Sequence, residues 1–289
     1  MSMTIAQIWR YPVKSMQGEL LDHSAVLPGG IPNDRGWAVR DEASGTIRGA
    51  KYLGGLLQCS ARYLPGTSAG PVPHAEITLP DGRTVNTDDP AAASAVSEVL
   101  ARAVTLWPLQ PAEDAEHYRV KGHEHADMES HLRTIFALLP DEPLPDLSVW
   151  PADLLAELTT YAAPRGTYFD AVPLHVLTDA SMSALAAALP DTAIDVRRFR
   201  PNLVIHVDGD APGPVEQAWV GRTLAAGSVR IAAELPCPRC VMTTREQGDL
   251  ERAPQIMRTL VRAFRQNLGV YGRATTGGPL EVGTPVEVL

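Results

Sequence analysis

The residues best suited to chemistry in this chain are two cysteines in the segment 235–240, whose sequence is LPCPRC. A thiolate beside an arginine suits soft-metal binding or redox chemistry, because a nearby guanidinium favours the charged form of the sulfur. Four interpretations of Cys237 and Cys240 compete: half of a zinc site, a dithiol redox pair, one thiolate ligand for a soft metal, and two buried cysteines that pack as small apolar groups. The rest of the sequence must separate them.

The zinc and dithiol interpretations fit the surrounding sequence less well than the other two. Structural zinc takes four Cys or His ligands, but the third cysteine, Cys59, stands alone and no His-x₃₋₅-His pair follows Cys240. In thioredoxin-like proteins a Cys-x-x-Cys pair begins a helix, whereas here we expect it between two strands, at 229–233 and 241–244. A single thiolate ligand or a buried pair is therefore favoured.

Polar segments elsewhere in the chain carry groups that bind anions. Lys14 and Ser15 end a predicted strand, where a charge and a hydroxyl together can hold an anionic oxygen. Arg35 precedes a predicted strand and can offer its planar guanidinium to a phosphate or carboxylate. A local ion pair with Asp34 is the simpler interpretation of that arginine.

Two further polar segments lie in the second half. Three arginines crowd residues 197–200 just before a predicted apolar strand, which favours an anionic partner over a solvated surface. Tyr271 follows a predicted helix and can present its hydroxyl to a site or fill a core position. A soft thiolate together with these anion-binding groups indicates a large anionic ligand that carries a soft metal, such as a phosphate-bearing organic ligand.

The composition and the missing motifs argue against several functions. The chain has 25 Lys and Arg against 34 Asp and Glu, a formal net charge of −9, which argues against nucleic acid as a partner. Three cysteines do not make a disulfide framework, and the first residues lack a signal peptide, so we expect a cytoplasmic protein. No apolar run is long enough for a membrane span, and the common nucleotide, hydrolase and zinc-protease motifs are missing.

The first half is expected to be rich in β-structure. Short apolar runs divided by turns predict a meander or small barrel, with strands at 5–11, 20–21, 36–40 and 75–79. A helix is predicted at 92–103. Residues 108–151 are rich in Pro, Asp, Glu and His and indicate a solvated connector. The alternative is a metal site built from some of the histidines there, His117, His123, His125 and His131.

The second half mixes strands with helices. Its predicted strands lie at 174–177, 202–207, 229–233, 241–244 and 286–289. Short helices are predicted at 154–158 and 180–188, the second with an N-cap from Thr178 and Asp179.

One strongly amphipathic helix is predicted at 254–268. Its apolar residues recur every three or four positions, and Gly269 stands where a C-cap glycine is expected. The opposite face is expected to be solvated and carries Arg258, Arg262 and Arg265.

Six short segments, spread over nearly the whole chain, together resemble the MOSC-domain proteins that carry an N-terminal β-barrel domain. The segments are YPVKS at 11–15, DRGW at 34–37, LHVLTDAS at 174–181, FRPN at 199–202, CPRC at 237–240 and YG at 271–272. The resemblance implies an α+β, β-rich fold in three parts. These are an N-terminal β-barrel domain at 1–110, a linker or crossover at 111–165, and a MOSC β-barrel domain with flanking helices at 166–289.

The same resemblance implies a molybdenum cofactor, a pyranopterin dithiolene with a terminal phosphate, buried between the two domains. Cys240 is then the thiolate ligand to molybdenum and the catalytic residue, whereas Cys237 is not a ligand. The residues that resemble the family's cofactor-binding groups are Lys14, Ser15 and Arg35 from the barrel side, and Ser181, Arg200, Asn202, Arg239 and Tyr271 from the MOSC side.

The resemblance further implies an enzyme. Relatives such as the mitochondrial amidoxime reducing component reduce N-hydroxylated compounds by oxygen-atom transfer to molybdenum. This chain has no Cys-x₄-Cys-x₂-Cys run, so we expect electrons from a separate protein that is ferredoxin- or flavin-reductase-like. Three alternatives stay open: a cofactor or sulfur carrier without turnover, an oxotransferase of specialised metabolism that acts on S- or N-oxides, and a dithiol redox protein.

Overall fold

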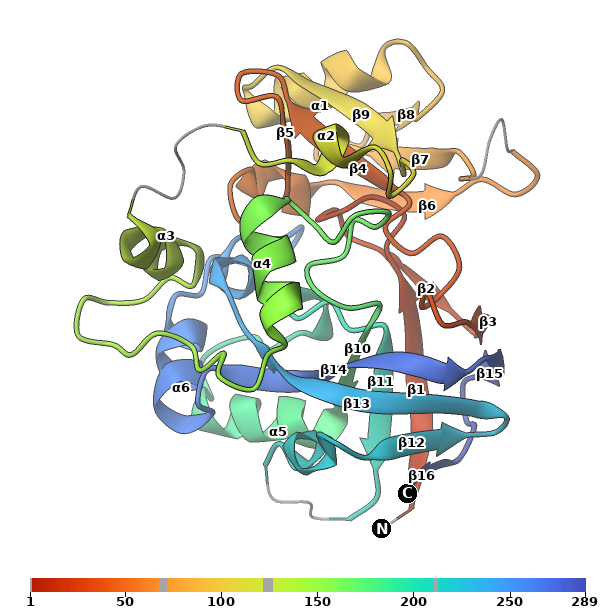
Figure 1. The fold of residues 1–289 in the computed structure, drawn as a ribbon, viewed down its shortest axis with the longest axis vertical. Coiled ribbons are helices and arrows are strands. Elements are labelled where there is room, and N and C mark those ends of the chain that lie inside the picture. The colour runs from red at the N-terminus through yellow and green to blue at the C-terminus, as the bar shows by residue number, and fades with distance from the viewer. Residues whose placement is uncertain (1, 68–71, 122–126, 210–212) are drawn as a thin grey trace.

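One eight-stranded sheet joins the two ends of the sequence (Figure 1). The computed structural model describes residues 2–67, 72–121, 127–209 and 213–289. The strand order in this sheet is β16-β12-β13-β14-β10-β11-β1-β2. The strands are β1 (Met3–Arg10), β2 (Glu19–Leu21), β10 (Leu174–Thr178), β11 (Leu203–Val207), β12 (Thr223–Ala226), β13 (Val229–Pro238), β14 (Asn267–Thr276) and β16 (Val286–Val288).

The first strand of the chain belongs to the sheet of the second half. β1 pairs antiparallel with β11, with Ile5 opposite Ile205. A separate two-stranded sheet also joins the two halves, because β3 (His23–Val26) pairs with β15 (Gly278–Glu281). The two halves are therefore joined by backbone hydrogen bonds as well as by side-chain packing, and the boundaries at 110 and 166 stay a prediction.

Two small sheets form the rest of the N-terminal half, at the top of Figure 1. One contains β4 (Trp37–Asp41), β5 (Thr46–Arg48) and β9 (Val104–Pro108), and the other β6 (Ser60–Tyr63), β7 (Ala75–Thr78) and β8 (Thr84–Asn86). The short helix η1 (Gly54–Gln58) and α1 (Ala92–Leu100) close their shared core. α1 ends earlier than the predicted 103 because Ala101 adopts a left-handed backbone, with φ of 47°. The predicted β-rich α+β fold is confirmed.

The two cysteines differ in burial and in their position relative to strand β13. Buried and partly buried residues alternate along its whole length, and Cys237 is one of the buried residues. The pairing of β13 with β14 shifts register after Ala233 and again after Pro236. The predicted strand at 241–244 is wrong, since these residues form a 3₁₀ helix, η4 (Val241–Thr244). The hydroxyls of Thr243 and Thr244 donate to carbonyl groups three residues earlier, which stabilises a turn instead of a strand.

The predicted connector is largely folded. It contains α2 (Ala115–Tyr118), α3 (Met128–Ile135) and, just beyond it, α4 (Ala152–Thr160). α4 lies across the junction of the two halves, and α3 lies at one side of it (Figure 1). His117 and His131 contact tyrosines, Tyr168 and Tyr52 respectively. His123 and His125 lie outside the described residues.

Two longer helices pack on the large sheet. α5 (Asp179–Ala188) and α6 (Gln255–Ala263) share an apolar cluster with Leu177 of β10 and Leu268 of β14. Thr178 is the N-cap of α5, as predicted, because its hydroxyl accepts a hydrogen bond from the backbone of Ser181. The remaining 3₁₀ helices of the described residues are η2 (Val196–Arg198) and η3 (Val215–Trp219).

The amphipathic helix α6 differs from the prediction in two respects. It ends at Ala263 because Arg265 and Gln266 have left-handed backbones, so Gly269 lies in β14 and is not a C-cap. Arg258 does not face solvent, since its guanidinium binds the Glu142 carboxylate and the carbonyl oxygen of Ala137. This contact ties α6 to the segment between α3 and α4.

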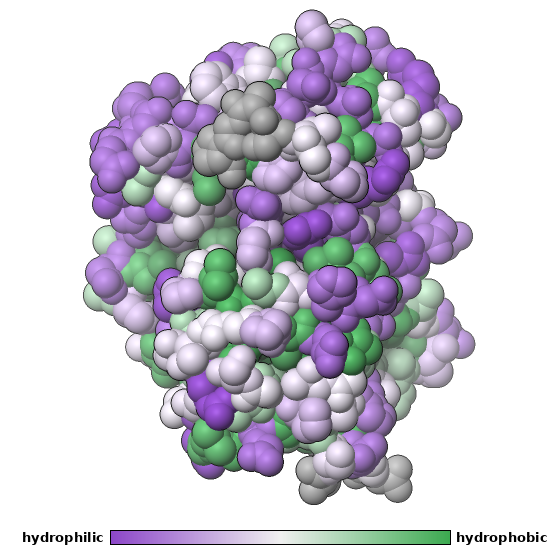
Figure 2. Space-filling view, turned by 90° about the vertical axis from the view of Figure 1, so that its right-hand side faces the viewer, coloured by the Kyte–Doolittle hydropathy of each residue, from purple (hydrophilic) through white to green (hydrophobic). Residues whose placement is uncertain are grey.

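The molecular surface mixes polar and apolar groups. On the face shown in Figure 2, hydrophobic residues form small separate groups among hydrophilic ones. Across the described part of the chain, no helix combines the length and the apolar character that a membrane crossing requires.

Candidate functional site

A cavity lies where the N-terminal half, the large sheet and the α3–α4 segment meet. Its lining includes seven cationic side chains within the described residues, and Asp170 is the one carboxylate among the lining residues there. Cys240 also lines it. The cationic residues are Lys14, Arg35, Arg48, Lys51, Arg198, Arg200 and Arg239. Such an excess of positive charge in a partly buried space favours an anionic ligand.

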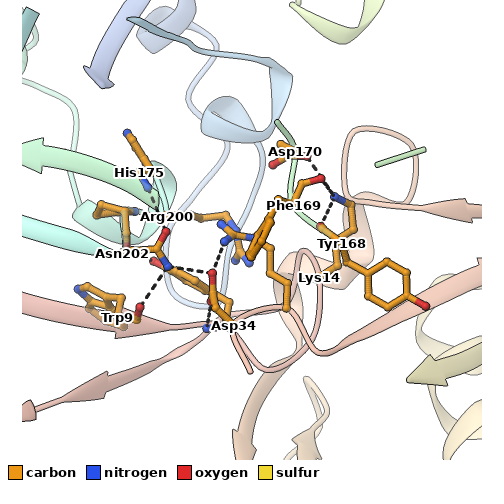
Figure 3. Close-up of polar contacts among 12 residues, drawn as sticks. Trp9, Lys14, Asp34, Tyr168, Phe169, Asp170, His175, Arg200 and Asn202 are labelled. Atoms are coloured by element: carbon orange, nitrogen blue, oxygen red, sulfur yellow. Dashed lines mark hydrogen bonds and ion pairs between the residues drawn. The ribbon is translucent and has the colours of Figure 1, made fainter. Parts of the chain in front are cut away.

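Lys14 reaches the cavity wall from the loop after β1 (Figure 3). Its Nζ donates to the carbonyl oxygen of Tyr168 at 2.7 Å and to Asp170 Oδ1 at 3.3 Å. Burial lowers the pKa of Lys14 to about 8. Burial opposes the ionisation of Asp170, but the charges of Lys14 and Lys51 outweigh it and lower the pKa of that carboxyl group. This wall therefore carries a lysine whose charge changes near neutral pH.

The affinity of the ligand-free protein for sulfate is expected to fall roughly tenfold between pH 7 and pH 9.5. The Lys14 ammonium is charged below its pKa of about 8 and loses its proton above it, and a hydrogen bond to a charged group contributes about 1.5–3 kcal/mol. Isothermal titration calorimetry measures this change, and sulfate itself does not titrate in the range. The variant Lys14→Met should bind more weakly with little pH dependence; an unchanged slope in that variant contradicts the assignment.

Asp34 organises the polar network behind the cavity (Figure 3). Its carboxylate forms an ion pair with Arg35 and accepts from the backbone N–H of Tyr11 at 2.8 Å and from Asn202 Nδ2 at 2.9 Å. Asn202 Oδ1 in turn accepts from the backbone of His175 at 3.1 Å. The local ion pair and the cavity position of Arg35 are thus both observed.

Three arginines at the cavity each keep a buried donor group without a partner, and Arg198 Nε is one of these groups. Arg200 lies with its Cζ 4.1 Å from the centre of the Tyr11 ring and donates from Nη1 to the Met16 carbonyl oxygen, while its buried Nη2 has no partner. Arg239 donates from Nη2 to the Phe199 carbonyl oxygen at 2.7 Å, and its buried Nε has no partner. A buried donor without an acceptor is costly, so the three groups favour a bound acceptor.

Three of the predicted cofactor-binding residues have left-handed backbones. The φ angles are 70° at Ser15, 54° at Arg35 and 55° at Arg200. Residues with a Cβ atom adopt this conformation rarely, and it persists where the surrounding structure enforces it. At Ser15, the hydroxyl oxygen accepts from the backbone of Ala50 at 2.9 Å. Strain at three residues of one cavity indicates that their orientation serves a ligand.

The two cysteines have different surroundings. Cys240 is partly exposed and lines the cavity, whereas Cys237 is fully buried. Arg239 donates from Nη1 to Cys237 Sγ at 2.8 Å, and its guanidinium also interacts electrostatically with Cys240. That Arg239 favours the thiolate of Cys240 stays a prediction. Burial raises the pKa of Cys237, although Arg239 opposes the change. Cys237 lies at a buried position within β13, whereas Cys240 lies beyond the end of that strand.

Ser181 is the one predicted site residue that does not line the cavity. Its hydroxyl donates to the buried carboxylate of Glu216, which also accepts from Thr178 Oγ1 at 2.7 Å and from the backbone of Gly269 at 3.0 Å. Lys14, Ser15, Arg35, Arg200, Asn202, Arg239, Cys240 and Tyr271 all line it. Ser181 thus lies in the first turn of α5, where it contacts Glu216 and is not part of the cavity lining.

Burial raises the pKa of Glu216, although Ser181 and Thr178 oppose the change. The folded state therefore favours the protonated carboxyl, so this stabilisation is present at low pH and is lost as the pH rises through the folded-state pKa. The free energy of unfolding of the wild type, relative to Glu216→Gln, should fall as the pH is raised from 4 to 8. Urea unfolding at each pH measures this difference, and a constant or rising difference contradicts it.

Other cavity residues were missed from the sequence. His175 was assigned only to a strand, yet its Nε2 lies 3.4 Å from Arg239 Nη1, and burial together with Arg239 lowers its pKa. A histidine inside an apolar strand was an available signal for it. Lys51 and Asp170, 3.7 Å apart, had no such signal because only the folded chain brings them together.

Fold and site together define a two-part β protein with a cationic, thiol-bearing cavity at the junction of its halves. The MOSC domain family model matches residues 164–287, and the MOSC N-terminal beta barrel domain model matches residues 2–99. Together these matches take in more than half of the chain. The chain therefore belongs to the MOSC-domain proteins with an N-terminal MOSC β-barrel domain.

Two human proteins are among the relatives. Mitochondrial amidoxime reducing component 2 is 30% identical over 134 residues, which cover 41% of this chain and 38% of that protein. This match spans less than half of the relative's length. Mitochondrial amidoxime-reducing component 1 is 24% identical over 99% of this chain and 83% of that protein. Among solved structures, the YUAD protein of Bacillus subtilis aligns with all of this chain and 96% of its own, at 10% identity and a TM-score of 0.42.

Proposed function

We propose that this protein is a molybdenum-cofactor-dependent oxidoreductase that reduces N-hydroxylated compounds by oxygen-atom transfer. The observation that carries the proposal is the cavity itself, where a partly exposed thiol stands among seven cationic side chains. Family membership supports it, because MOSC domains are associated with binding of the molybdenum cofactor. The names of the amidoxime reducing components supply the substrate class.

The residues present fit such a cofactor. A terminal phosphate needs cationic donors, and Arg200 Nη2 and Arg239 Nε are buried donors that lack a partner. A molybdenum ion prefers a soft ligand, and Cys240 offers a free thiol in the same cavity. We infer that Cys240 is the metal ligand and that Lys14, Ser15, Arg35, Arg200, Asn202, Arg239 and Tyr271 hold or orient the organic part.

The protein's own contribution is binding and positioning. When bound, the cofactor would supply the two-electron chemistry that accepts an oxygen atom from an N–O group. Lys14 and the arginines neutralise the charge of the anionic ligand, and Asp34 fixes the orientation of Arg35 and Asn202. Apolar residues of the α3–α4 segment line part of the cavity and would limit the access of water to a bound ligand.

We further propose that a separate protein supplies the electrons and that the reaction takes place in the cytoplasm. A plant-type iron–sulfur cluster requires four cysteines, and this chain has three in total. Of these three, Cys59 and Cys237 are buried. An external donor of the ferredoxin or flavin-reductase kind agrees with this count.

Protein purified from a molybdenum-replete host should contain about one molybdenum and one pterin per chain. The loaded protein should then reduce hydroxylamine and benzamidoxime when reduced methyl viologen supplies electrons. A loaded protein that turns over no N-hydroxylated compound favours a cofactor or sulfur carrier, and turnover of S-oxides alone favours the other oxotransferase class. A preparation with neither metal nor pterin overturns the proposal.

A further inference from the structure

Tyr11 contacts two of the cavity arginines but does not itself line the cavity. The residue stands in the YPVKS segment and is only 2% exposed. Its ring and its hydroxyl are therefore enclosed by the protein, and a bound molecule in the cavity would not touch them. A buried tyrosine of this kind acts through the groups that surround it.

The Tyr11 ring lies next to both guanidinium groups. The Cζ atom of Arg200 lies 4.1 Å from the centre of the ring, and that of Arg35 lies 5.2 Å from it. An aromatic face attracts a cation within about 6 Å, and more strongly where water is excluded. Burial lowers the pKa of Arg200 to about 10, and the charge of Arg35 also acts to lower it. One neutral ring thus attracts two buried like charges that repel each other.

The polar groups of Tyr11 fix the backbone close to both arginines. Its carbonyl oxygen accepts from the Arg35 backbone N–H at 2.7 Å, and its hydroxyl donates to the Pro201 carbonyl oxygen at 2.9 Å. Pro201 directly follows Arg200. Arg35 and Arg200 both have left-handed backbones, which persist only where neighbouring contacts enforce them. Tyr11 supplies one such contact near each arginine.

The large sheet brings these segments together. Tyr11 directly follows β1, and Arg200 lies shortly before β11, the strand that pairs with β1. The Trp9 backbone N–H donates to the Asn202 carbonyl oxygen at 2.8 Å, which extends this pairing toward Tyr11. Arg35 belongs to the N-terminal half and Arg200 to the C-terminal half. Tyr11 is therefore a point at which one arginine of each half is held.

We propose that Tyr11 is a positioning residue that holds Arg35 and Arg200 in the orientation in which both guanidinium groups bind one anionic ligand. Loss of the ring should let the two groups move apart and lower the affinity for an anion about tenfold. This inference rests on the proposed function for the nature of the natural anion. The hold on the arginines itself can be measured without the cofactor.

Sulfate binding to the cofactor-free protein at pH 7, measured by isothermal titration calorimetry, tests the proposal. In Tyr11→Leu the Kd should rise about tenfold, whereas in Tyr11→Phe, which keeps the ring, it should rise less than about threefold. Trp107→Leu is the matched control, because the Trp107 ring holds the Arg40 guanidinium at 4.5 Å in the same half but does not line the cavity. Its Kd should stay within about twofold of the wild type. An unchanged Kd in Tyr11→Leu overturns the proposal.

Double variants separate positioning from a general loosening of the protein. In the Arg200→Met background, Tyr11→Leu should raise the Kd less than about threefold, because one of the two held groups is gone. In the Lys14→Met background it should keep its effect of about tenfold, since the Lys14 ammonium is held by Tyr168 and Asp170. Equal factors in both backgrounds overturn the proposal. Tyr11→Met, whose longer side chain fills more of the buried space, replaces Tyr11→Leu if that variant does not fold.

This proposal and the proposed function can fail separately. Protein from a molybdenum-replete host that contains neither metal nor pterin, but shows the expected sulfate affinities, rejects only the proposed function. Turnover of N-hydroxylated compounds by the loaded wild type, together with an unchanged sulfate Kd in Tyr11→Leu, rejects only the positioning role of Tyr11.

Discussion

Cys240→Ala is expected to lower the molybdenum content to less than about a tenth and the reductase rate by more than about 100-fold. Removal of a group that only supports a metal ligand costs about 10–100-fold, so loss of the ligand itself should exceed that range. Cys240 is the partly exposed thiol of the cavity, and alanine leaves no soft atom there. Metal analysis and viologen-linked kinetics on the same preparation measure both effects.

Cys237→Ala is the matched control for Cys240→Ala. Cys237 is fully buried and accepts a hydrogen bond from Arg239, which also binds the Phe199 carbonyl oxygen. Because Arg239 keeps that second contact, the activity should stay within about tenfold of the wild type, which corresponds to about 1.4 kcal/mol. Equal loss in the two variants supports the dithiol interpretation and rejects the single-ligand assignment.

Asp34→Ala is expected to lower the free energy of unfolding by about 3–5 kcal/mol. The substitution leaves the Arg35 charge buried without its partner, which is strongly destabilising. It also removes the acceptor of the Tyr11 backbone and of Asn202. Urea unfolding of the cofactor-free protein, followed by circular dichroism, gives the value.

Glu76→Ala provides the matched control. Glu76 forms an ion pair with Arg62 at 2.8 Å, but the Arg62 side chain is 60% exposed. Solvent screens such a pair, and its loss should cost less than about 1 kcal/mol. If Asp34→Ala is as mild as Glu76→Ala, the Asp34 network does not organise the cavity in the way described.

Local patterns in the sequence carried much of the fold and part of the site. The alternation of β13 could be read from residues 229–233. The N-cap of α5 followed from Thr178 alone. These features depend on neighbours within a few positions, which is the information that residue spacing contains.

Features that depend on distant contacts were not predictable. The burial of Arg258 follows from contacts with Ala137 and Glu142, more than a hundred residues earlier. The same holds for the part of the cavity lining that the α3–α4 segment supplies, since Pro, Asp, Glu and His make this segment resemble a solvated connector. The ion pairs of Asp170 with Lys14 and Lys51 could not be predicted either, because only the folded chain brings these residues together.

The position of β1 in the sheet of the second half has a consequence for the order of folding. During synthesis, residues 3–10 emerge first, yet their partner strand β11 at 203–207 follows almost two hundred residues later. Pairings of this sequence separation are slow to form, so the edge of β1 opposite to β2 stays open while the intervening chain is made. Lys14 and Arg35 follow that strand, and the cavity can close only when the last third of the protein is present.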